Sequence, residues 1–321
     1  MAKTSHIVFL DRNTLGPEVA LRKPSFDHLW TDYPATADHE LITRAKDAQI
    51  IVLNKVPMTA SIVSQLPKLA LVAVAATGVD VIDLAACAKA GVAVCNVRDY
   101  AITSVPEHIL SVMFALRRRL PAYRRRIAQG DWQSSGQFCF FDRPITDLAG
   151  SRLGIIGTGS IGTALGALAE AVGMQVAHHS LSGRVLDDRL MLSLEELLHT
   201  SDVVSLNCPL TNASRNLINA NNLQRMKSDA LLINTARGAM VDLHALERAL
   251  VGGRLGGAGI DVCDIEPPSH DDPIMRLCHL DNVIVTPHSA WASGASMQTL
   301  ADQLIDCIEA YEAGRSMNRL V

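Results

Sequence analysis

The chain has 321 residues, of which 48% are hydrophobic and 19% are charged, and its formal net charge is −4. This composition is typical of a globular protein with room for two domains, and it excludes a disordered or fibrous chain. The small charge gives no general attraction to nucleic acids or membranes, and no apolar run reaches the roughly 18–20 residues of a membrane span. Seven cysteines without CxxC or zinc-ligand spacing, and a start that lacks a signal-peptide pattern, predict a cytoplasmic protein without disulfides or metal.

Short apolar runs alternate with helical patterns along the whole chain, which predicts a parallel α/β architecture. In the first third the expected strands are His6–Leu10, Ile50–Leu53, Leu71–Ala75 and Val92–Cys95. Helical patterns between them cover Ala60–Gln65 and Asp83–Ala90. Gly91 follows the second helical pattern, where a glycine in the left-handed conformation ends a helix.

A long helical stretch begins at Ser104. Ser104 and Glu107 have the spacing of a capping box, and Pro106 falls in the first turn, where its missing N–H is harmless. The apolar spacing continues to Ile127, but Pro121 should kink or divide the helix. A loop rich in serine, glycine and aromatic residues is expected at residues 132–144.

A second strand series follows, and it ends in one amphipathic helix at Ser296–Ala313. The expected strands are Leu153–Ile156, Gln175–His178, Val203–Leu206, Ala230–Asn234, Gly259–Val262 and Val283–Thr286. Six parallel strands are the number found in a complete dinucleotide-binding domain.

The sequence Gly157-Thr-Gly159-Ser-Ile-Gly162 stands between the first of these strands and a helical pattern. In that context Gly157 permits the tight turn, Gly159 lets a pyrophosphate approach the backbone, and Gly162 lets helix and strand pack closely. The N-terminus of the helix offers free N–H groups to the phosphates. The alternative is a glycine turn that serves packing alone.

Several segments together carry a resemblance to a known family. They are Ala76–Asp80, Ser104–His108, Gly157–Gly162, Asn207–Thr211, Asn234–Gly238, Asp261–Pro267 and Thr286–Trp291. In this order they resemble the D-isomer-specific 2-hydroxyacid dehydrogenases, most closely the branch of glycerate dehydrogenases and hydroxypyruvate reductases. The resemblance implies a Rossmann dinucleotide-binding domain, residues 102–289, inserted into a flavodoxin-like substrate-binding domain, residues 1–101 and 290–321. It also implies a homodimer built around the long helix and the loop after it.

The same resemblance implies a catalytic set of three residues. Arg237 matches the arginine that binds the substrate carboxylate through its guanidinium fork and polarises the adjacent carbonyl. His288 matches the acid/base, which gives a proton to the keto oxygen during reduction and takes it back during oxidation. Glu266 matches the carboxylate partner of this histidine and favours the imidazolium. A nicotinamide supplies the hydride, and no metal is needed. Taken singly, each residue can be an ordinary loop or structural residue.

Substrate and cofactor contacts are expected on the loops that follow the strands. The N–H groups of Gly78 and Val79 would form a cradle for the substrate carboxylate, the alternative being a glycine turn capped by Asp80. Asn54 is a further substrate-contact candidate. The expected cofactor contacts are Ser104, Gly157, Thr158, Gly159, Ser160, Ile161, Gly162, His179, Ser180, Arg184, Cys208, Pro209, Thr235, Ala236, Asp261, His288 and Ala290.

The cofactor is NAD(H) or NADP(H). NAD-specific Rossmann sites usually carry an acid about 20 residues after the glycine motif. Ser180 stands there instead, and no carboxylate lies between Gln175 and Arg184. Ser180, His179 and Arg184 would supply hydrogen-bond donors to a 2′-phosphate. We therefore expect NADPH to be accepted.

The predicted reaction reduces a small 2-keto acid, with hydroxypyruvate or glyoxylate favoured, to the D-2-hydroxy acid. One alternative keeps the fold and changes the substrate to phosphoglycerate, formate, phosphite or a bulkier keto acid. The other is a dinucleotide-sensing co-regulator, to which the basic clusters Arg117–Arg119 and Arg124–Arg126 point. Because these arginines alternate with an apolar helical stripe, we expect them on a solvated or dimer-facing surface.

Overall fold

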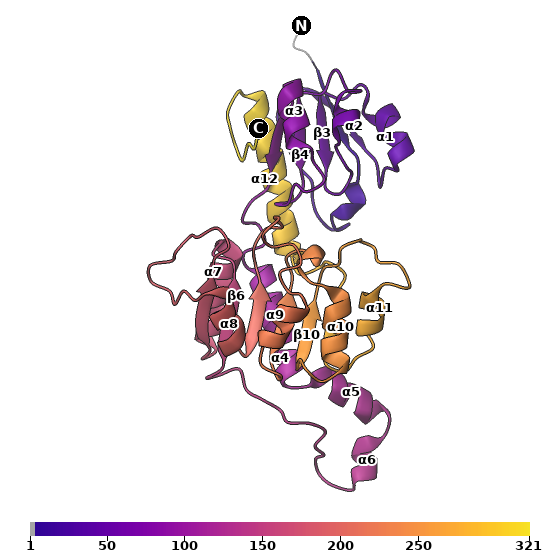
Figure 1. Ribbon diagram of the computed structural model, residues 1–321. Coiled ribbons are helices and arrows are strands. Elements are labelled where there is room, and N and C mark those ends of the chain that lie inside the picture. The colour runs from indigo at the N-terminus through magenta and orange to yellow at the C-terminus, as the bar shows by residue number, and fades with distance from the viewer. Residues whose placement is uncertain (1–3) are drawn as a thin grey trace. The chain divides into compact units, whose positions relative to one another are not determined.

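The computed structural model describes residues 4–321, and the chain divides into two compact units (Figure 1). The first unit contains the chain up to Ala101 together with Ala292–Val321, and the second contains Ile102–Trp291. The sequence places the second boundary after residue 289, but Trp291 belongs to the second unit. Its indole Nε1 donates to the carbonyl oxygen of His288 at 3.0 Å, and its own carbonyl oxygen accepts a hydrogen bond from Ser104 Oγ at 3.2 Å. Residues 1–3 of the expected first domain lie outside the described residues.

The first unit is built on a five-stranded parallel sheet with the order β2-β1-β3-β4-β5. Its strands are β1 Ser5–Phe9, β2 His28–Asp32, β3 Ile50–Leu53, β4 Leu71–Val74 and β5 Ala93–Asn96. Its helices are η1 Arg12–Thr14, α1 Asp38–Ala45, α2 Ala60–Val63, α3 Leu84–Ala90 and α12 Gly294–Glu312. The sequence did not predict β2, because this edge strand has no apolar run and its residues are half-buried or exposed.

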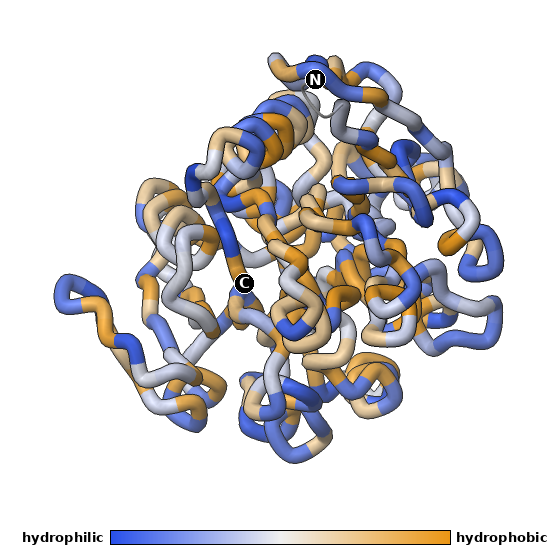
Figure 2. The backbone as a smooth tube through the Cα atoms, turned by 90° about the horizontal axis from the view of Figure 1, so that it is seen from above, coloured by the Kyte–Doolittle hydropathy of each residue, from blue (hydrophilic) through white to orange (hydrophobic). Residues whose placement is uncertain are grey.

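Both faces of this sheet are covered, since helices pack on each side of a parallel sheet. Side chains from β1, β3 and β4 form one hydrophobic cluster with α1, α2 and α3. Helix α12 packs against β4 and β5 and buries Leu300, Leu304 and Ile308. The C-terminal helix therefore completes the domain of the N-terminal third, as the resemblance implies. Figure 2 shows hydrophobic stretches of backbone in the interior and long hydrophilic stretches in the outer loops.

The second unit is built on a six-stranded parallel sheet with the order β11-β10-β9-β8-β6-β7. Its strands are β6 Arg152–Ile156, β7 Gln175–His179, β8 Val203–Leu206, β9 Leu231–Asn234, β10 Gly257–Ile260 and β11 Val283–Val285. Its helices are α4 Ser104–Arg117, α5 Leu120–Ala128, α6 Asp131–Ser135, α7 Ser160–Ala171, α8 Leu194–Thr200, α9 Ala220–Arg225, η2 Gly238–Met240, α10 Leu243–Val251 and α11 Pro273–Leu277. Helices α4 and α7 pack together against the sheet, and residues from α8, α9 and α10 join the main hydrophobic cluster. The two-domain α/β fold predicted from the sequence is confirmed.

The start of α4 differs from the expected capping box. Thr103 is the residue before the helix and no side chain caps it, so Ser104 is already the first helical residue. The Ser104 hydroxyl donates to the Trp291 carbonyl instead, and the predicted pairing with Glu107 is wrong because it needs Ser104 one position earlier. The predicted division at Pro121 is confirmed: α4 ends at Arg117, and Pro121 lies in the first turn of α5.

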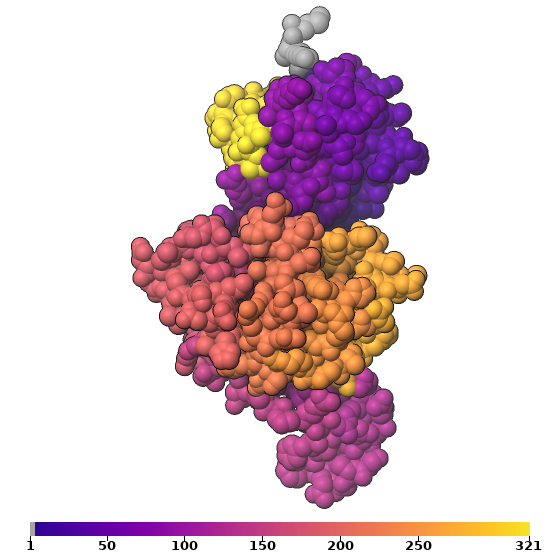
Figure 3. Space-filling view, viewed as in Figure 1, coloured from indigo at the N-terminus to yellow at the C-terminus, as the bar shows by residue number. Residues whose placement is uncertain are grey.

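Helices α5 and α6 and the chain that follows them project from the body of the second unit (Figures 1 and 3). This arm contains most of the expected loop at residues 132–144, in which α6 forms a short helix. Arg126 holds it together through Asp131 and Asp142, each at 2.5 Å. The aromatic rings of Phe138 and Phe141 nevertheless lie in solvent, 90% and 83% exposed.

Most of the six arginines of the basic clusters are engaged within the second unit. Arg117 is buried rather than solvated, contrary to expectation, and donates to the carbonyl oxygens of Asp202 and Asp229 at 2.6 and 3.4 Å. The other ion pairs are Arg118–Asp147, Arg119–Asp142, Arg125–Asp281 and the two of Arg126. Such pairing leaves little unneutralised charge for a nucleic-acid backbone. Within residues 4–321, no helix combines the length and the apolar character needed to cross a membrane.

Candidate active site

Three loops at the carboxyl ends of β9, β10 and β11 carry the residues predicted to be catalytic. These strands are neighbours in the sheet, so the loops that follow them lie at one edge. Arg237 follows β9, Glu266 follows β10 and His288 follows β11. His288 Nδ1 and Glu266 Oε2 are 2.6 Å apart, and 25% and 30% of these side chains are exposed. With Nδ1 engaged by the carboxylate, Nε2 is the ring nitrogen that can exchange a proton with a ligand.

The backbone of His288 is held in an uncommon conformation by a buried acid. Its φ of +53° lies in the left-handed region, which a side-chain-bearing residue adopts only when its surroundings impose it. The His288 N–H donates to the Asp261 carbonyl oxygen at 2.7 Å. The Asp261 carboxylate accepts hydrogen bonds from Thr286 Oγ1 at 2.5 Å, Ser289 N at 2.9 Å and Ala290 N at 3.1 Å. Asp261 thus fixes the loop that presents the histidine, a role the sequence did not reveal; its contact with the nicotinamide stays a prediction.

A second buried polar residue shapes the loop of Arg237. Asn234 ends β9; its Oδ1 accepts the Ala236 N–H at 3.1 Å, and its Nδ2 donates to the Arg237 carbonyl oxygen at 2.9 Å. The Arg237 guanidinium donates to the Ala236 carbonyl oxygen at 2.8 Å. Thr235 Oγ1 is buried and has no hydrogen-bond partner among residues 4–321. The signal that could have found Asn234 is an amide residue at the end of a buried strand, since such residues bond their own downstream backbone.

The three glycines of the turn after β6 differ in the space around them. Gly157 has a φ of +131°, and a Cβ there would lie 2.3 Å from the carbonyl oxygen of Asn207. A Cβ on Gly162 would lie 2.7 Å from the carbonyl oxygen of Gly157. A Cβ on Gly159 would meet no atom within 4 Å. Packing within the protein therefore requires Gly157 and Gly162, whereas Gly159 borders open space.

This turn lies at the point where the strand order reverses, between β6 and β8. In open parallel sheets, ligands bind outside the carboxyl ends of the strands at such a point. Helix α7 begins at Ser160 and directs free N–H groups toward the turn. The open space at Gly159 and this helix terminus fit a dinucleotide whose phosphates lie on the turn.

The segment expected to bind the adenosine ribose follows β7. His179 is the last residue of the strand, and its Nδ1 is 3.0 Å from the carbonyl oxygen of Leu192. The Ser180 and Ser182 hydroxyl oxygens are 3.2 Å apart, and Arg184 is exposed. This contact occupies one ring nitrogen of His179, and the contacts of His179, Ser180 and Arg184 with the cofactor stay predictions.

Cys208 and Pro209 follow β8 on the other side of the glycine turn. Burial raises the pKa of the Cys208 thiol to about 11, so this cysteine is a neutral, apolar wall at neutral pH. The Pro209 carbonyl oxygen accepts a hydrogen bond from Ser214 at 2.8 Å, which fixes the loop. Residues 4–321 hold no group of three or more His, Cys, Asp or Glu side chains placed to bind a metal ion.

In the first unit, the substrate-contact candidates lie on loops after two neighbouring strands. Asn54 follows β3, and Gly78 and Val79 follow β4. The turn that contains Gly78 is fastened to the end of β5: Asn96 Nδ2 donates to the Thr77 carbonyl oxygen at 2.8 Å, and Thr77 Oγ1 donates to a backbone carbonyl beyond that strand. These contacts give the turn a defined shape.

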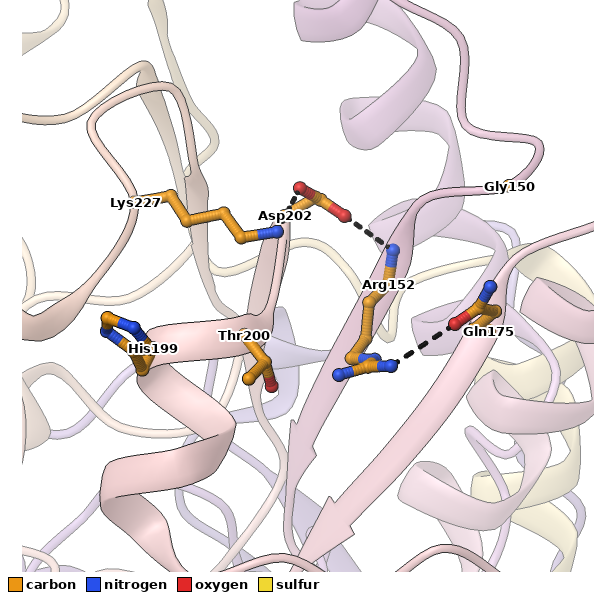
Figure 4. Close-up of a pocket in the computed structure, with 7 residues that line it drawn as sticks. All are labelled: Gly150, Arg152, Gln175, His199, Thr200, Asp202 and Lys227. Atoms are coloured by element: carbon orange, nitrogen blue, oxygen red, sulfur yellow. Dashed lines mark hydrogen bonds and ion pairs between the residues drawn. The ribbon is translucent and has the colours of Figure 1, made fainter.

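A separate hollow of about 400 Å³ lies at the opposite edge of the second sheet (Figure 4). Arg152 and Gln175 begin β6 and β7, and Asp202 precedes β8, so this hollow is at the amino ends of the strands. Asp202 accepts the Arg152 backbone N–H at 2.7 Å and pairs with Lys227 at 2.8 Å. The hollow therefore lies apart from the predicted catalytic and cofactor residues.

Comparison with known proteins gives the family. Residues 110–290 match the model of the D-isomer specific 2-hydroxyacid dehydrogenase NAD-binding domain. The chain is 48% identical to a glycerate dehydrogenase of Methylorubrum extorquens, with 98% of both chains covered. It is 33% identical to a hydroxypyruvate reductase of Blautia hydrogenotrophica, with 87% of both covered. The structure matches D-lactate dehydrogenase of Aquifex aeolicus, complexed with NAD and lactic acid, with a TM-score of 0.81, 27% identity and 96% of both chains covered. The chain therefore belongs to the D-isomer specific 2-hydroxyacid dehydrogenases, which are oxidoreductases that use a nicotinamide dinucleotide and act on a small hydroxy or keto acid.

Proposed function

We propose that the protein reduces a small 2-keto acid, hydroxypyruvate or glyoxylate, to the D-2-hydroxy acid with His288 as acid/base, Glu266 as its partner and Arg237 as the carboxylate ligand. The observation that carries the proposal is the 2.6 Å contact between His288 and Glu266, on the loops after β11 and β10, with Arg237 on the loop after β9, the next strand of the sheet. The names of the glycerate dehydrogenase and hydroxypyruvate reductase relatives support this substrate class.

The chemistry follows from these positions. Arg237 binds the carboxylate of the keto acid and polarises the adjacent carbonyl. A dinucleotide held by its phosphates at the glycine turn would supply a hydride from its reduced nicotinamide to C2 of the keto acid. His288 donates its Nε2 proton to the carbonyl oxygen, which becomes the hydroxyl of the product, and the neutral imidazole then takes a proton from water. Glu266 stabilises the imidazolium before that transfer.

The first experiment is a turnover assay that follows the absorbance of reduced nicotinamide. Hydroxypyruvate, glyoxylate and pyruvate are each tested with NADPH and with NADH. His288→Ala should lower kcat about 10²–10⁴-fold, the usual contribution of a general acid. His279→Ala is the matched control, because His279 is exposed and lies before β11, whereas His288 lies after it. Dinucleotide binding without turnover of any of these three keto acids would instead favour a bulkier keto acid or a sensing role.

We further propose that NADPH is accepted as well as NADH, because Ser180 replaces the usual acid. Ser180→Asp should lower kcat/KM with NADPH at least tenfold and leave that with NADH within about threefold, because a carboxylate repels the 2′-phosphate. Arg184→Ala should weaken NADPH more than NADH, whereas Arg225→Ala, an exposed arginine paired with Glu195, should affect neither. A wild type that strongly prefers NADH would refute this part.

A homodimer formed through the projecting arm is also proposed. Exposed apolar side chains that lie close together mark interaction sites, and Phe138 and Phe141, three residues apart on this arm, are 90% and 83% exposed. Replacing both by serine should convert a dimer into a monomer in light scattering after size exclusion. Val251→Ser on α10, also an exposed apolar position, is the control and should leave the mass unchanged. The predicted cytoplasmic location is tested by cell fractionation.

A further inference from the structure

One loop of the first unit is fixed by a carboxylate from a neighbouring strand. Asp11 follows β1, and only 5% of it is exposed. Its Oδ1 accepts the Asn54 N–H at 2.9 Å, and its Oδ2 accepts the Lys55 N–H at 2.7 Å and the Val56 N–H at 3.3 Å. Three consecutive backbone N–H groups of the loop after β3 therefore converge on one side chain.

This contact extends the connection between β1 and β3 beyond the strands. Their paired residues end at Phe9 and Val52, after which the Leu10 N–H still donates to the Val52 carbonyl oxygen at 2.9 Å. From Asp11 onward a side chain replaces the backbone ladder. Burial raises the pKa of Asp11, while the N–H groups that it accepts favour the ionised form. Burying a carboxylate is costly unless it is hydrogen-bonded. The buried Asp11 side chain therefore stabilises the one arrangement of the loop that supplies these N–H groups.

This contact lies where the order of the strands reverses. The strand order β2-β1-β3-β4-β5 reverses between β1 and β3, and Asp11 spans that point at the carboxyl ends of the two strands. Ligands of open parallel sheets bind in that position. The loop that Asp11 holds contains Asn54, already a substrate-contact candidate, and the exposed Lys55, whose charge suits an anionic substrate. The Gly78 turn follows the adjacent strand β4.

We propose that Asp11 is a positioning residue for the substrate, which holds residues 54–56 in the shape in which Asn54 and Lys55 meet the 2-keto acid. This role rests on the proposed function. Asp11 makes no contact with the reacting atoms; it acts through the loop. Its loss should therefore weaken substrate binding without altering the chemical step or the affinity for the dinucleotide, whose glycine turn belongs to the other unit.

The test compares Asp11→Asn with Leu41→Ala. Asparagine keeps the shape but turns an NH₂ group toward N–H donors, so the loop loses its anchor. Leu41 of α1 is buried in the hydrophobic cluster that also contains Leu10 and Val56, but it lies outside the loop. Its replacement by alanine should therefore lower the stability of the unit without removing the anchor of the loop. Asp11→Asn should raise KM for the keto acid at least tenfold, with kcat and the Kd of the dinucleotide within about threefold of wild type. Amide hydrogen exchange at residues 54–56 should become faster.

If Asp11→Asn does not fold, Lys55→Ala still tests the proposal. It removes the charged side chain but keeps the backbone N–H of residue 55 that donates to Asp11. This variant should also raise KM, at a melting temperature close to that of wild type. An unchanged KM in either folded variant, or an equal rise in Leu41→Ala, would overturn the role of Asp11 alone. A wild type inactive toward every 2-keto acid would overturn the proposed function and, with it, this role.

Discussion

Two glycines of the turn after β6 should respond to alanine in different ways. At Gly157, φ is +131°, and a Cβ would lie 2.3 Å from the carbonyl oxygen and 2.6 Å from the carbonyl carbon of Asn207. Both atoms are backbone, so the turn or the loop after β8 has to move. Left-handed strain of about 1–3 kcal/mol and overpacking of about 1–3 kcal/mol together give a loss of about 2–6 kcal/mol. In a unit of this size, that corresponds to a fall in Tm of about 4–24 °C.

At Gly159 the same substitution meets no atom within 4 Å, and φ is −83°. Alanine at this helix N-cap costs no more than about 1 kcal/mol. Its methyl group would, however, stand where the pyrophosphate approaches, so the Kd of the dinucleotide should rise at least tenfold, or about 1.4 kcal/mol.

Thermal unfolding followed by circular dichroism, and titration of nicotinamide fluorescence, separate the two effects. Gly157→Ala should melt well below wild type, and Gly159→Ala should melt within a few degrees of it but bind the dinucleotide weakly. A Gly157→Ala protein with the Tm of wild type would refute the packing argument. Unchanged affinity in Gly159→Ala would refute the assignment of the phosphates to this turn.

Three further predictions concern charge and pH. Glu266→Gln should lower kcat for reduction at least tenfold with little change in Tm, because the amide keeps a hydrogen bond to His288 but not the charge that stabilises its imidazolium; an unchanged kcat would argue against the pair. Burial lowers the pKa of His178 below its usual value, so the unfolded chain binds the proton more readily, and the free energy of unfolding should fall as pH drops below about 6.5. In His178→Leu, the free energy of unfolding measured by urea titration should fall less steeply with pH than in wild type. Equal slopes against pH would contradict this. Hydrogen bonds from Arg22 and, to a smaller extent, Ser25 hold the pKa of Glu309 at about 2; the resulting stability is present above about pH 4.3, is lost toward pH 2, and should be smaller in Arg22→Ala. Because the Arg22 and Glu309 side chains are partly exposed, their contribution to the free energy of unfolding is small, and salt should reduce it. A difference between wild type and Arg22→Ala that does not depend on salt would contradict this.

The sequence by itself determined the elements that depend on local pattern. Parallel strands buried on both faces read as continuous apolar runs, so β3 at Ile50–Leu53 and β8 at Val203–Leu206 were predicted with the bounds that the structure has. Gly91 ends its helix with a φ of +71°, as a terminal glycine should. The seven matched segments, which include the glycine motif, Arg237, Glu266 and His288, were together enough to indicate the family.

Tertiary structure decided what depends on partners distant in sequence. No local pattern tells that Ser104 donates to Trp291 rather than capping its own helix, or that β2 pairs as an edge strand without an apolar run. The sequence does not single out Asp11, and it singles out Asp261 only as an expected cofactor contact. Each holds the loop of a neighbouring strand only because the sheet brings the carboxyl ends of adjacent strands together, where one buried carboxylate can accept several backbone N–H groups.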